Sequence, residues 1–185
     1  MVGLAGSVYL AAWRKIKHVI NLKPQALTKT AFAAFGDVIE TDGAQHYPIN
    51  QGTTERYHNL ARVDVDELEG QPLISIFRGQ PRPLPIALIM MERHPLASQA
   101  FIPMQRRDYL VVVSKPSEAV GPADLQAFRA RGDQGVNYHR GVWHHPLLVL
   151  EPDSDFLIVD RGGEGHNLDE IWFEDDADKV FLSAT

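Results

Sequence analysis

Residues 84–115 read LPIALIMMERHPLASQAFIPMQRRDYLVVVSK, and this stretch decides the fold class of the chain. It holds three apolar runs that are short, rich in branched and aromatic side chains, and separated by prolines or by clusters of polar residues. Runs of this length between turn-forming residues are typical of β-strands rather than of helices. The three predicted strands are LPIALIMMERH, QAFIPM and DYLVVVSK.

The same alternation of apolar runs and turn signals extends on both sides of this stretch. The 12 prolines and 14 glycines of the chain fall mostly between the runs, as they do in β-rich barrels and sandwiches. We therefore predict a mainly β protein with a few short helices. The other predicted strands are HVINLKPQAL, DVIET, ERYHNLARVDV, PLISIFRG, HPLLVLE and SDFLIVDRGG.

Two segments carry the signals of short helices. In residues 28–35 either Thr28 or Thr30 can cap a helix, two phenylalanines share one face, and Gly36 follows as a stop. In GPADLQAFRARGD, residues 121–133, a Gly-Pro pair and a later glycine enclose the apolar pair Leu125 and Phe128. We expect one helix in each segment.

Length and composition restrict the class of protein. A chain of 185 residues with 44% hydrophobic and 23% charged residues is expected to form one globular domain. Its formal net charge of −6 argues against generic nucleic-acid binding, which requires a cationic face, and means that an anionic substrate would have to be bound by local arginines. The absence of cysteine excludes disulfides and cysteine-ligated metals, and it suits a cytoplasmic location.

The first residues form a segment of their own. Residues 2–13 are mostly small and apolar and basic residues follow them, whereas a signal peptide carries its positive charge first. The run is also shorter than the roughly 20 apolar residues that a membrane-spanning helix needs, and no other segment approaches that length. We expect residues 1–18 to form a poorly ordered extension, residues 19–185 to form a single domain, and no contact with a membrane.

Residues 135–147, GVNYHRGVWHHPL, hold three of the eight histidines of the chain. In one continuous strand His139 and His144 would point to opposite faces, because they lie an odd number of positions apart. A turn at Gly141 would reset this alternation, so that both side chains face one cavity and His145 points away. We therefore expect at most two of the three histidines to share a site.

A second group of polar residues lies upstream, in ERHPLASQAFIP, residues 92–103. Glu92 and His94 are two positions apart, so in a strand their side chains share a face. The short loop that starts at Pro95 can bring Gln99, at the beginning of the next strand, to that same face. These residues are expected to form one half of a site whose other half contains the downstream histidines.

Together the two segments resemble the paired motifs of the cupin superfamily. In metal-binding cupins, H-x-H followed by a glutamate, and later P-x-G-x-x-H, supply four ligands inside a small β-barrel. The matching positions here are Glu92, His94 and Gln99, followed by HRGVWH at residues 139–144, which ends in His144. The resemblance implies a cupin-like barrel of the jelly-roll type with a metal at Glu92, His94, Gln99 and His144. The departures from the pattern weaken that metal site, since glutamine is a weak ligand for transition metals.

Six blocks of sequence carry a narrower resemblance, which covers nearly the whole chain beyond residue 19. In order they are AFAAFGDVIE, NQGTTERYHNLA, LISIFRGQP, MERHPLASQAFIPM, GVNYHRGVWHHPL and DFLIVDRGG. They are similar to the blocks of the ureidoglycolate lyase family, also called ureidoglycolate hydrolase. The resemblance implies one catalytic domain over residues 19–185, a homodimer, and cleavage of ureidoglycolate to glyoxylate and urea in allantoin and purine breakdown. It further implies a divalent metal of the nickel class and no nucleotide cofactor.

The histidines suit this reaction. Ureidoglycolate is a carbinolamide, and breaking its C–N bond requires removal of the hydroxyl proton and protonation of the urea nitrogen. Histidines, whose unperturbed pKa is about 6.5, can perform both transfers near neutral pH. His144 is the first candidate for a base or metal ligand and His94 is the second. His139 is the candidate acid, and Tyr138 is an alternative proton donor and a candidate substrate contact.

The substrate carboxylate calls for a cation. The planar guanidinium of arginine can bind a carboxylate through two parallel hydrogen bonds. Arg56 and Arg78 are the candidates, because both lie in matching blocks and on predicted strands that could line a barrel.

Two other functions remain open at the level of sequence. An amidohydrolase acting on ureidoglycolate would release ammonia and carbon dioxide together with glyoxylate, and the residues named above do not separate it from a lyase. A non-catalytic cupin that binds a small carboxylate is compatible with the replacements at Glu92 and Gln99.

Overall fold

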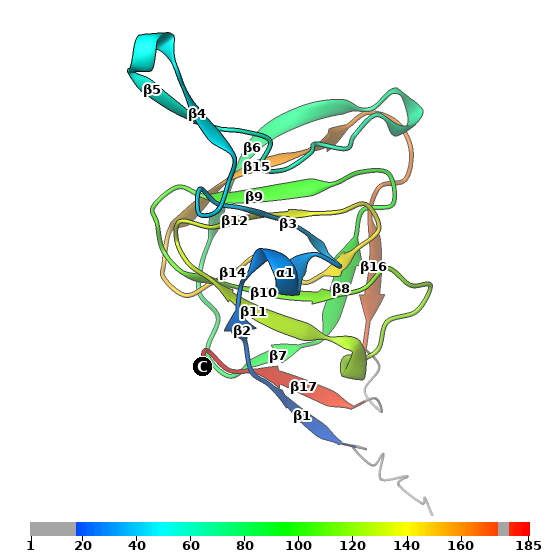
Figure 1. Ribbon diagram of the computed structural model, residues 1–185. Helices are drawn as coiled ribbons and strands as arrows, with labels where there is room; N and C mark the ends of the chain where they lie inside the picture. Colours follow the sequence, from blue (N-terminus) through cyan, green and yellow to red (C-terminus); the bar gives the residue numbers. More distant parts are fainter. Residues whose placement is uncertain (1–17, 174–177) are drawn as a thin grey trace, which may run out of the picture.

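The computed structural model describes residues 18–173 and 178–185, and this part of the chain is mainly β with a few short helices, as the sequence predicts (Figure 1). The expectation of a poorly ordered extension over residues 1–18 lies outside the described residues, His18 excepted. No helix in the described ranges is long enough and apolar enough to cross a membrane.

The strands form three stacked sheets and a projecting hairpin (Figure 1). The upper sheet has the order β3(Gly36–Ile39), β12(Gly135–Tyr138), β9(Gln99–Pro103), β15(Ser154–Gly162), β6(Gln71–Gly79). The middle sheet has the order β16(Asp169–Trp172), β8(Met90–Arg93), β13(Trp143–His144), β10(Tyr109–Ser114), β11(Gln126–Ala130), β2(Gln25–Ala26), with β14(Leu148–Val149) also beside β10. The lower sheet has the order β1(Val19–Leu22), β17(Lys179–Leu182), β7(Ile86–Leu88), and the hairpin consists of β4(His46–Ile49) and β5(Thr54–Tyr57). The helical segments are α1(Lys29–Phe32), η1(Asn50–Gly52), η2(Glu67–Glu69) and η3(Pro122–Asp124).

Strand β10 lies at the centre of the layers. Its Tyr109, Val111 and Val113 belong to the core between the upper and middle sheets, whereas Leu110 and Val112 belong to the core between the middle and lower sheets. All six residues of the strand are buried. A strand that is buried on both faces reads as a continuous apolar run, and this is the origin of the sequence DYLVVVSK.

Helix α1 closes one side of the core between the upper and middle sheets. Its start is one of the two predicted from sequence, because the Thr28 side chain accepts a hydrogen bond of 3.2 Å from the backbone N–H of Ala31. Phe32 and Phe35 are both buried and pack against Phe128, with ring centroids 5.5 and 6.0 Å from its own. These edge-to-face aromatic contacts anchor the helix to the middle sheet.

The helix predicted over residues 121–133 is wrong. A single turn, η3, is followed by strand β11, which pairs with β10 in antiparallel register. Leu125 and Ala127 belong to the core between the middle and lower sheets. Phe128 and Ala130 belong to the core between the upper and middle sheets. This alternation with a period of two is that of a strand, and the helical boundary signals could not reveal it because both faces are apolar.

Candidate active site

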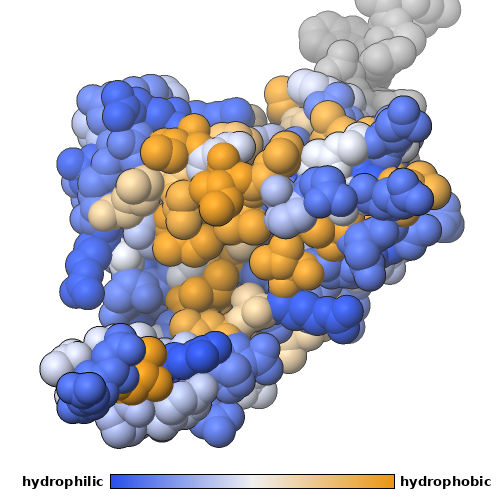
Figure 2. Space-filling view, turned by 90° about the horizontal axis from the view of Figure 1, so that it is seen from above, coloured by the Kyte–Doolittle hydropathy of each residue, from blue (hydrophilic) through white to orange (hydrophobic). Residues whose placement is uncertain are grey.

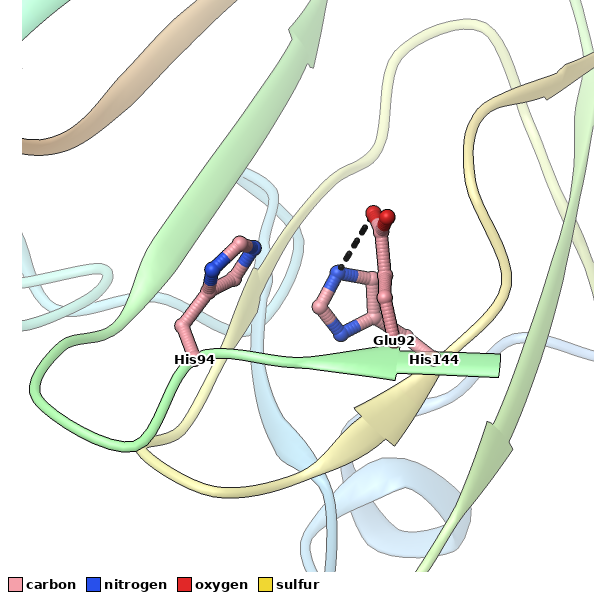
Figure 3. A group of neighbouring side chains, drawn as sticks. All are labelled: Glu92, His94 and His144. Carbon is pink, nitrogen blue, oxygen red and sulfur yellow. Dashed lines mark ion pairs between the residues drawn. The ribbon is translucent and has the colours of Figure 1, made fainter. Parts of the chain in front are cut away.

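Adjacent strands bring together Glu92 and His144. These two residues are paired in register between β8 and β13, so their side chains share a face of the middle sheet. Nε2 of the fully buried His144 lies 3.4 Å from Oε1 of Glu92. His94 follows β8 directly, and its ring centroid is 5.2 Å from that of His144. Figure 3 shows the three side chains pointing toward one another, and we refer to them as the cluster.

Backbone carbonyls fix the tautomers of both histidines in the cluster. Nδ1 of His94 lies 2.7 Å from the carbonyl oxygen of Asn167, and Nδ1 of His144 lies 3.1 Å from that of Val142. Since a carbonyl oxygen can only accept, Nδ1 carries the proton and donates in each case. In its neutral form each ring then has its lone pair on Nε2, and for His94 this requires the side-chain amide of Gln99 to turn its NH2 group toward that atom. In His144 this atom is buried without a hydrogen-bond partner among the described residues.

The donor set of the cluster fits a divalent metal ion. One ligand atom from each of Glu92, His94 and His144 lies within 4.8 Å of the others. Three lone-pair groups that converge in this way need a positive charge between them, and imidazole and carboxylate are common ligands of divalent first-row metals. Metal-bound histidines typically donate their other N–H to a carbonyl or carboxylate, as both histidines do here. Gln99 borders the cluster, with Oε1 3.1 Å from Nε2 of His94.

The environment shifts the pKa values of two members of the cluster. Burial raises the pKa of the Glu92 carboxyl, but the imidazole of His144, 3.4 Å away, together with His94 and His145, outweighs it, so the pKa lies below its usual value. Burial, with a smaller contribution from the charge of His144, lowers the pKa of His94 below its usual value. Glu92 is therefore ionised and His94 neutral near pH 7, and both are able to accept a proton or a metal ion.

Tyr138 forms a wall of this site. Its ring stacks on that of His144, with centroids 4.2 Å apart and planes 10° apart, and the side chain is buried. Burial raises the pKa of the Tyr138 phenol, so the hydroxyl keeps its proton at all physiological pH values. The stacking holds the imidazole of His144 in its orientation toward Glu92.

His139 does not join the cluster, although the turn expected at Gly141 is present. Gly141 has a φ of +74°, and the N–H of Val142 donates to the carbonyl of His139 across the turn. Tyr138 is the residue of β12 that faces His144, so the next residue in the strand must point to the other side. His139 is half-exposed, with Nε2 3.2 Å from Oδ2 of Asp37.

A separate cavity lies beside β3. It has a volume of about 430 Å³ and is lined by His139, Asp37, His58 and Lys29 among others. The expectation that His139 and His144 face one cavity is therefore wrong. His145 is buried but also lies outside the cluster, and burial lowers its pKa to about 4.

A chamber of about 350 Å³ adjoins the cluster. His94 and Gln99 belong to its wall, and His94 is the residue of the cluster that lines the chamber. The remaining wall contains Ser98, Asp160, Arg161 and the loop residues 165–168. A small polar molecule in this chamber would touch His94 first.

The two arginines expected to bind the substrate carboxylate lie elsewhere. Arg78 is on β6 and donates two hydrogen bonds, of 2.7 and 2.9 Å, to the carboxylate of Asp155 on the outer surface. Arg56 is exposed on the projecting hairpin, with its guanidinium 6.0 Å from the centroid of the Tyr47 ring. Neither side chain belongs to the wall of the chamber. Membership of a strand did not indicate on which side of the sheet, or in which sheet, each arginine would lie.

Asp160 and Arg161 are the charged residues of the chamber that sequence reasoning missed as site residues. Both lie near the end of β15, in the DRGG segment, where the two glycines suggested a tight turn. The available signal was the alternation in SDFLIVDRGG, in which Asp160 continues the inward series of Phe156 and Ile158.

Comparison with known proteins identifies the family of the chain. The family model described as ureidoglycolate lyase matches residues 19–180. A ureidoglycolate lyase of Brucella melitensis is 57% identical over 168 residues, which is 91% of this chain and 99% of the relative. One of Burkholderia mallei is 54% identical over 163 residues, 85% of this chain and 95% of the relative. One of Brucella anthropi is 58% identical over 158 residues, 85% and 93% of the two chains. The chain therefore belongs to the ureidoglycolate lyase family.

Proposed function

We propose that this protein is a carbon–nitrogen lyase that cleaves ureidoglycolate to glyoxylate and urea, in the breakdown of allantoin and purines. The observation that carries the proposal is the cluster of Glu92, His94 and His144 beside a small polar chamber, in a chain more than half identical to ureidoglycolate lyases over most of its length. The volume of the chamber, about 350 Å³, suits a substrate with nine heavy atoms.

The reaction needs the movement of only one proton. Loss of the hydroxyl proton lets the oxygen electrons form the aldehyde C=O bond, the C–N bond breaks, and the ureido nitrogen takes up a proton to become urea. Glu92 and His94 are both in their basic forms near pH 7, as their lowered pKa values require. The cluster can therefore take the proton from oxygen and return it to nitrogen, which is acid–base catalysis with one site acting in both directions.

We further propose that the cluster holds a divalent cation, of the nickel class, through Nε2 of His94, Nε2 of His144 and the Glu92 carboxylate. A bound cation would polarise the hydroxyl and carboxylate oxygens of the substrate and lower the pKa of the hydroxyl. With both imidazoles acting as ligands, the second carboxylate oxygen of Glu92 is the atom of the cluster that can carry the proton.

Product analysis of the purified protein tests the lyase assignment. We expect one urea for each glyoxylate and no ammonia when fresh ureidoglycolate is supplied without urease. Ammonia released in a 2:1 ratio to glyoxylate, without urea, would instead establish the amidohydrolase. Binding of glyoxylate with no turnover, with or without added nickel, manganese or zinc, would establish the non-catalytic alternative.

A homodimer is our proposal for the assembly, and the surface of β6 supports it. β6 is an edge strand of nine residues, and its Leu73, Ile74, Ile76 and Phe77 are all exposed. Figure 2 shows the apolar side chains gathered on the face that carries β6, beside the projecting hairpin. Long exposed apolar edge strands are normally covered by another chain. The absence of cysteine suits a reducing compartment, and we propose that the protein works in the cytoplasm.

A further inference from the structure

Two oppositely charged residues that line the chamber lack a charged partner among the described residues. Asp160 and Arg161 both line the chamber, and neither forms an ion pair with another described residue or with the other. Oδ1 of Asp160 is buried and has no hydrogen-bond partner in the described chain. Buried polar atoms without partners are rare because they lose their hydration, so such an atom in a cavity indicates a ligand.

The guanidinium of Arg161 is held rigidly by backbone atoms. Nε and Nη2 donate to the carbonyl of Glu67 at 3.2 and 2.7 Å, and Nη2 also donates to the carbonyl of Glu164 at 2.8 Å. The bare Cα of Gly70 makes room for it, since a Cβ there would lie 2.2 Å from Nε. The side chain is only 8% exposed, and both N–H groups of Nη1 remain available to a ligand. A carboxylate is the ligand that best matches these donors.

Asp160 is placed by strand register beside the catalytic cluster. Val159 of β15 pairs with Ala100 of β9. Because the two strands are antiparallel, the next residue of β15, Asp160, lies beside the preceding residue of β9, Gln99. Gln99 is in turn paired with Tyr138 and lies 3.1 Å from Nε2 of His94. Asp160 therefore lies in the same inward row as the residues that border the cluster. A carboxylate at this position can accept hydrogen bonds from N–H groups and would repel another carboxylate.

We propose that Asp160 and Arg161 form a polarised substrate clamp, in which Arg161 binds the carboxylate of the substrate and Asp160 binds the N–H groups of its ureido end. The proposal rests on the proposed function and identifies the residues that select its substrate. Because the chain has a net charge of −6, an anionic substrate has to be drawn in by a local cation. Opposite charges at the two ends also fix the orientation of the molecule, which leaves its central carbon facing His94.

Half-substrates separate the two ends of the clamp. Glycolate keeps the carboxylate and hydroxyl of ureidoglycolate, and N-(hydroxymethyl)urea keeps the ureido group and hydroxyl. In NMR titrations, we expect Arg161→Met to weaken glycolate binding by at least about 30-fold, as the loss of a charged hydrogen bond implies, and to change hydroxymethylurea binding less than about 3-fold. Asp160→Ala should weaken hydroxymethylurea binding by about 10-fold and leave glycolate binding unchanged or tighter.

Arg78→Met and Asp155→Ala are matched controls, because they remove the same residue types from a surface ion pair between β6 and β15, the strand that also carries Asp160 and Arg161. They should leave both affinities within about 2-fold, as expected for exposed pairs. Arg161→Lys keeps the charge and should retain part of the glycolate affinity if Arg161→Met is poorly folded. Equal effects of each variant on both half-substrates, or no effect on either, would overturn the clamp. Wild-type protein that binds both half-substrates but releases no urea would refute the proposed function and leave the clamp intact.

Discussion

Replacement of His144 by glutamine is expected to lower kcat/KM for ureidoglycolate by about 1,000-fold, within the range for loss of an acid–base or ligand side chain. His144 is fully buried, stacks on Tyr138 and directs its unpartnered Nε2 toward Glu92. Glutamine approximates the length of the imidazole, so the core remains filled, but an amide cannot carry the proton and is a poor metal ligand. Initial rates of urea release, measured over a range of substrate concentrations, give the change.

His145→Gln is the matched control for this variant. His145 is the next residue in the chain and is also buried, but it lies outside the cluster. We expect its kcat/KM to stay within about 5-fold of the wild-type value, since the residue contacts none of the reacting groups. Thermal unfolding of both variants separates loss of activity from loss of fold. A His144→Gln protein that unfolds at the wild-type temperature and keeps more than a tenth of the activity would remove His144 from the chemistry.

Replacement of Glu92 by glutamine is expected to reduce both metal affinity and activity. The carboxylate is the only anionic ligand of the three, and its pKa lies below the usual value, so it is fully charged at neutral pH. We expect nickel affinity and kcat/KM each to fall by at least about 100-fold, which exceeds the about 10–100-fold cost of losing a residue that only supports a ligand. Titration calorimetry with nickel and assays of the metal-loaded protein measure the two quantities.

Removal of the metal from the wild-type protein provides the companion measurement. Treatment with a chelator should lower activity to the level of the Glu92→Gln variant, and one equivalent of divalent metal per chain should restore it. The control variant is Glu55→Gln, whose carboxylate pairs with a histidine, His46, on the exposed hairpin. It should bind nickel and turn over substrate like the wild type. Full activity in wild-type protein that contains no metal would show that the cluster works by proton transfer alone.

The strand pattern could be read from sequence because short apolar runs and turn residues alternate along most of the chain. The prediction of a helix over residues 121–133 was wrong for a physical reason. Each face of β11 contributes buried apolar residues to a core, so these residues show no clear period of two in the sequence. The seven-stranded sheet and the three-stranded sheet each combine strands from distant parts of the chain. Strand β1, for example, pairs with β17, a contact that local patterns cannot predict.

Half of the site was predictable because it depends on local spacing. Glu92 and His94 share a strand face, and the loop after Pro95 returns Gln99 to it, as the two-residue alternation and the short loop require. The structure brings His144 to the same place. The prediction that His139 shares a cavity with His144 was wrong, because Tyr138 is the residue of β12 that faces His144.

Whether a charged residue faces the chamber or the solvent depends on contacts between distant segments. Arg78 pairs with Asp155 across two strands, and Arg161 is oriented by the carbonyl of Glu67 in a turn far upstream. Neither contact can be predicted from the local sequence. An arginine on a strand can face the solvent or a cavity with equal ease, and only the register of the sheet decides which of the two occurs.

A crystal structure with ureidoacetate bound tests the central claim most directly. This molecule is ureidoglycolate without its hydroxyl group, so it has both ends of the substrate and cannot undergo the elimination. We expect it in the chamber, with its carboxylate at Arg161, its ureido group at Asp160 and its central carbon next to His94. Ureidoacetate bound instead in the cavity of His58 and His139, with the chamber vacant, would contradict the assignment of the cluster as the catalytic centre.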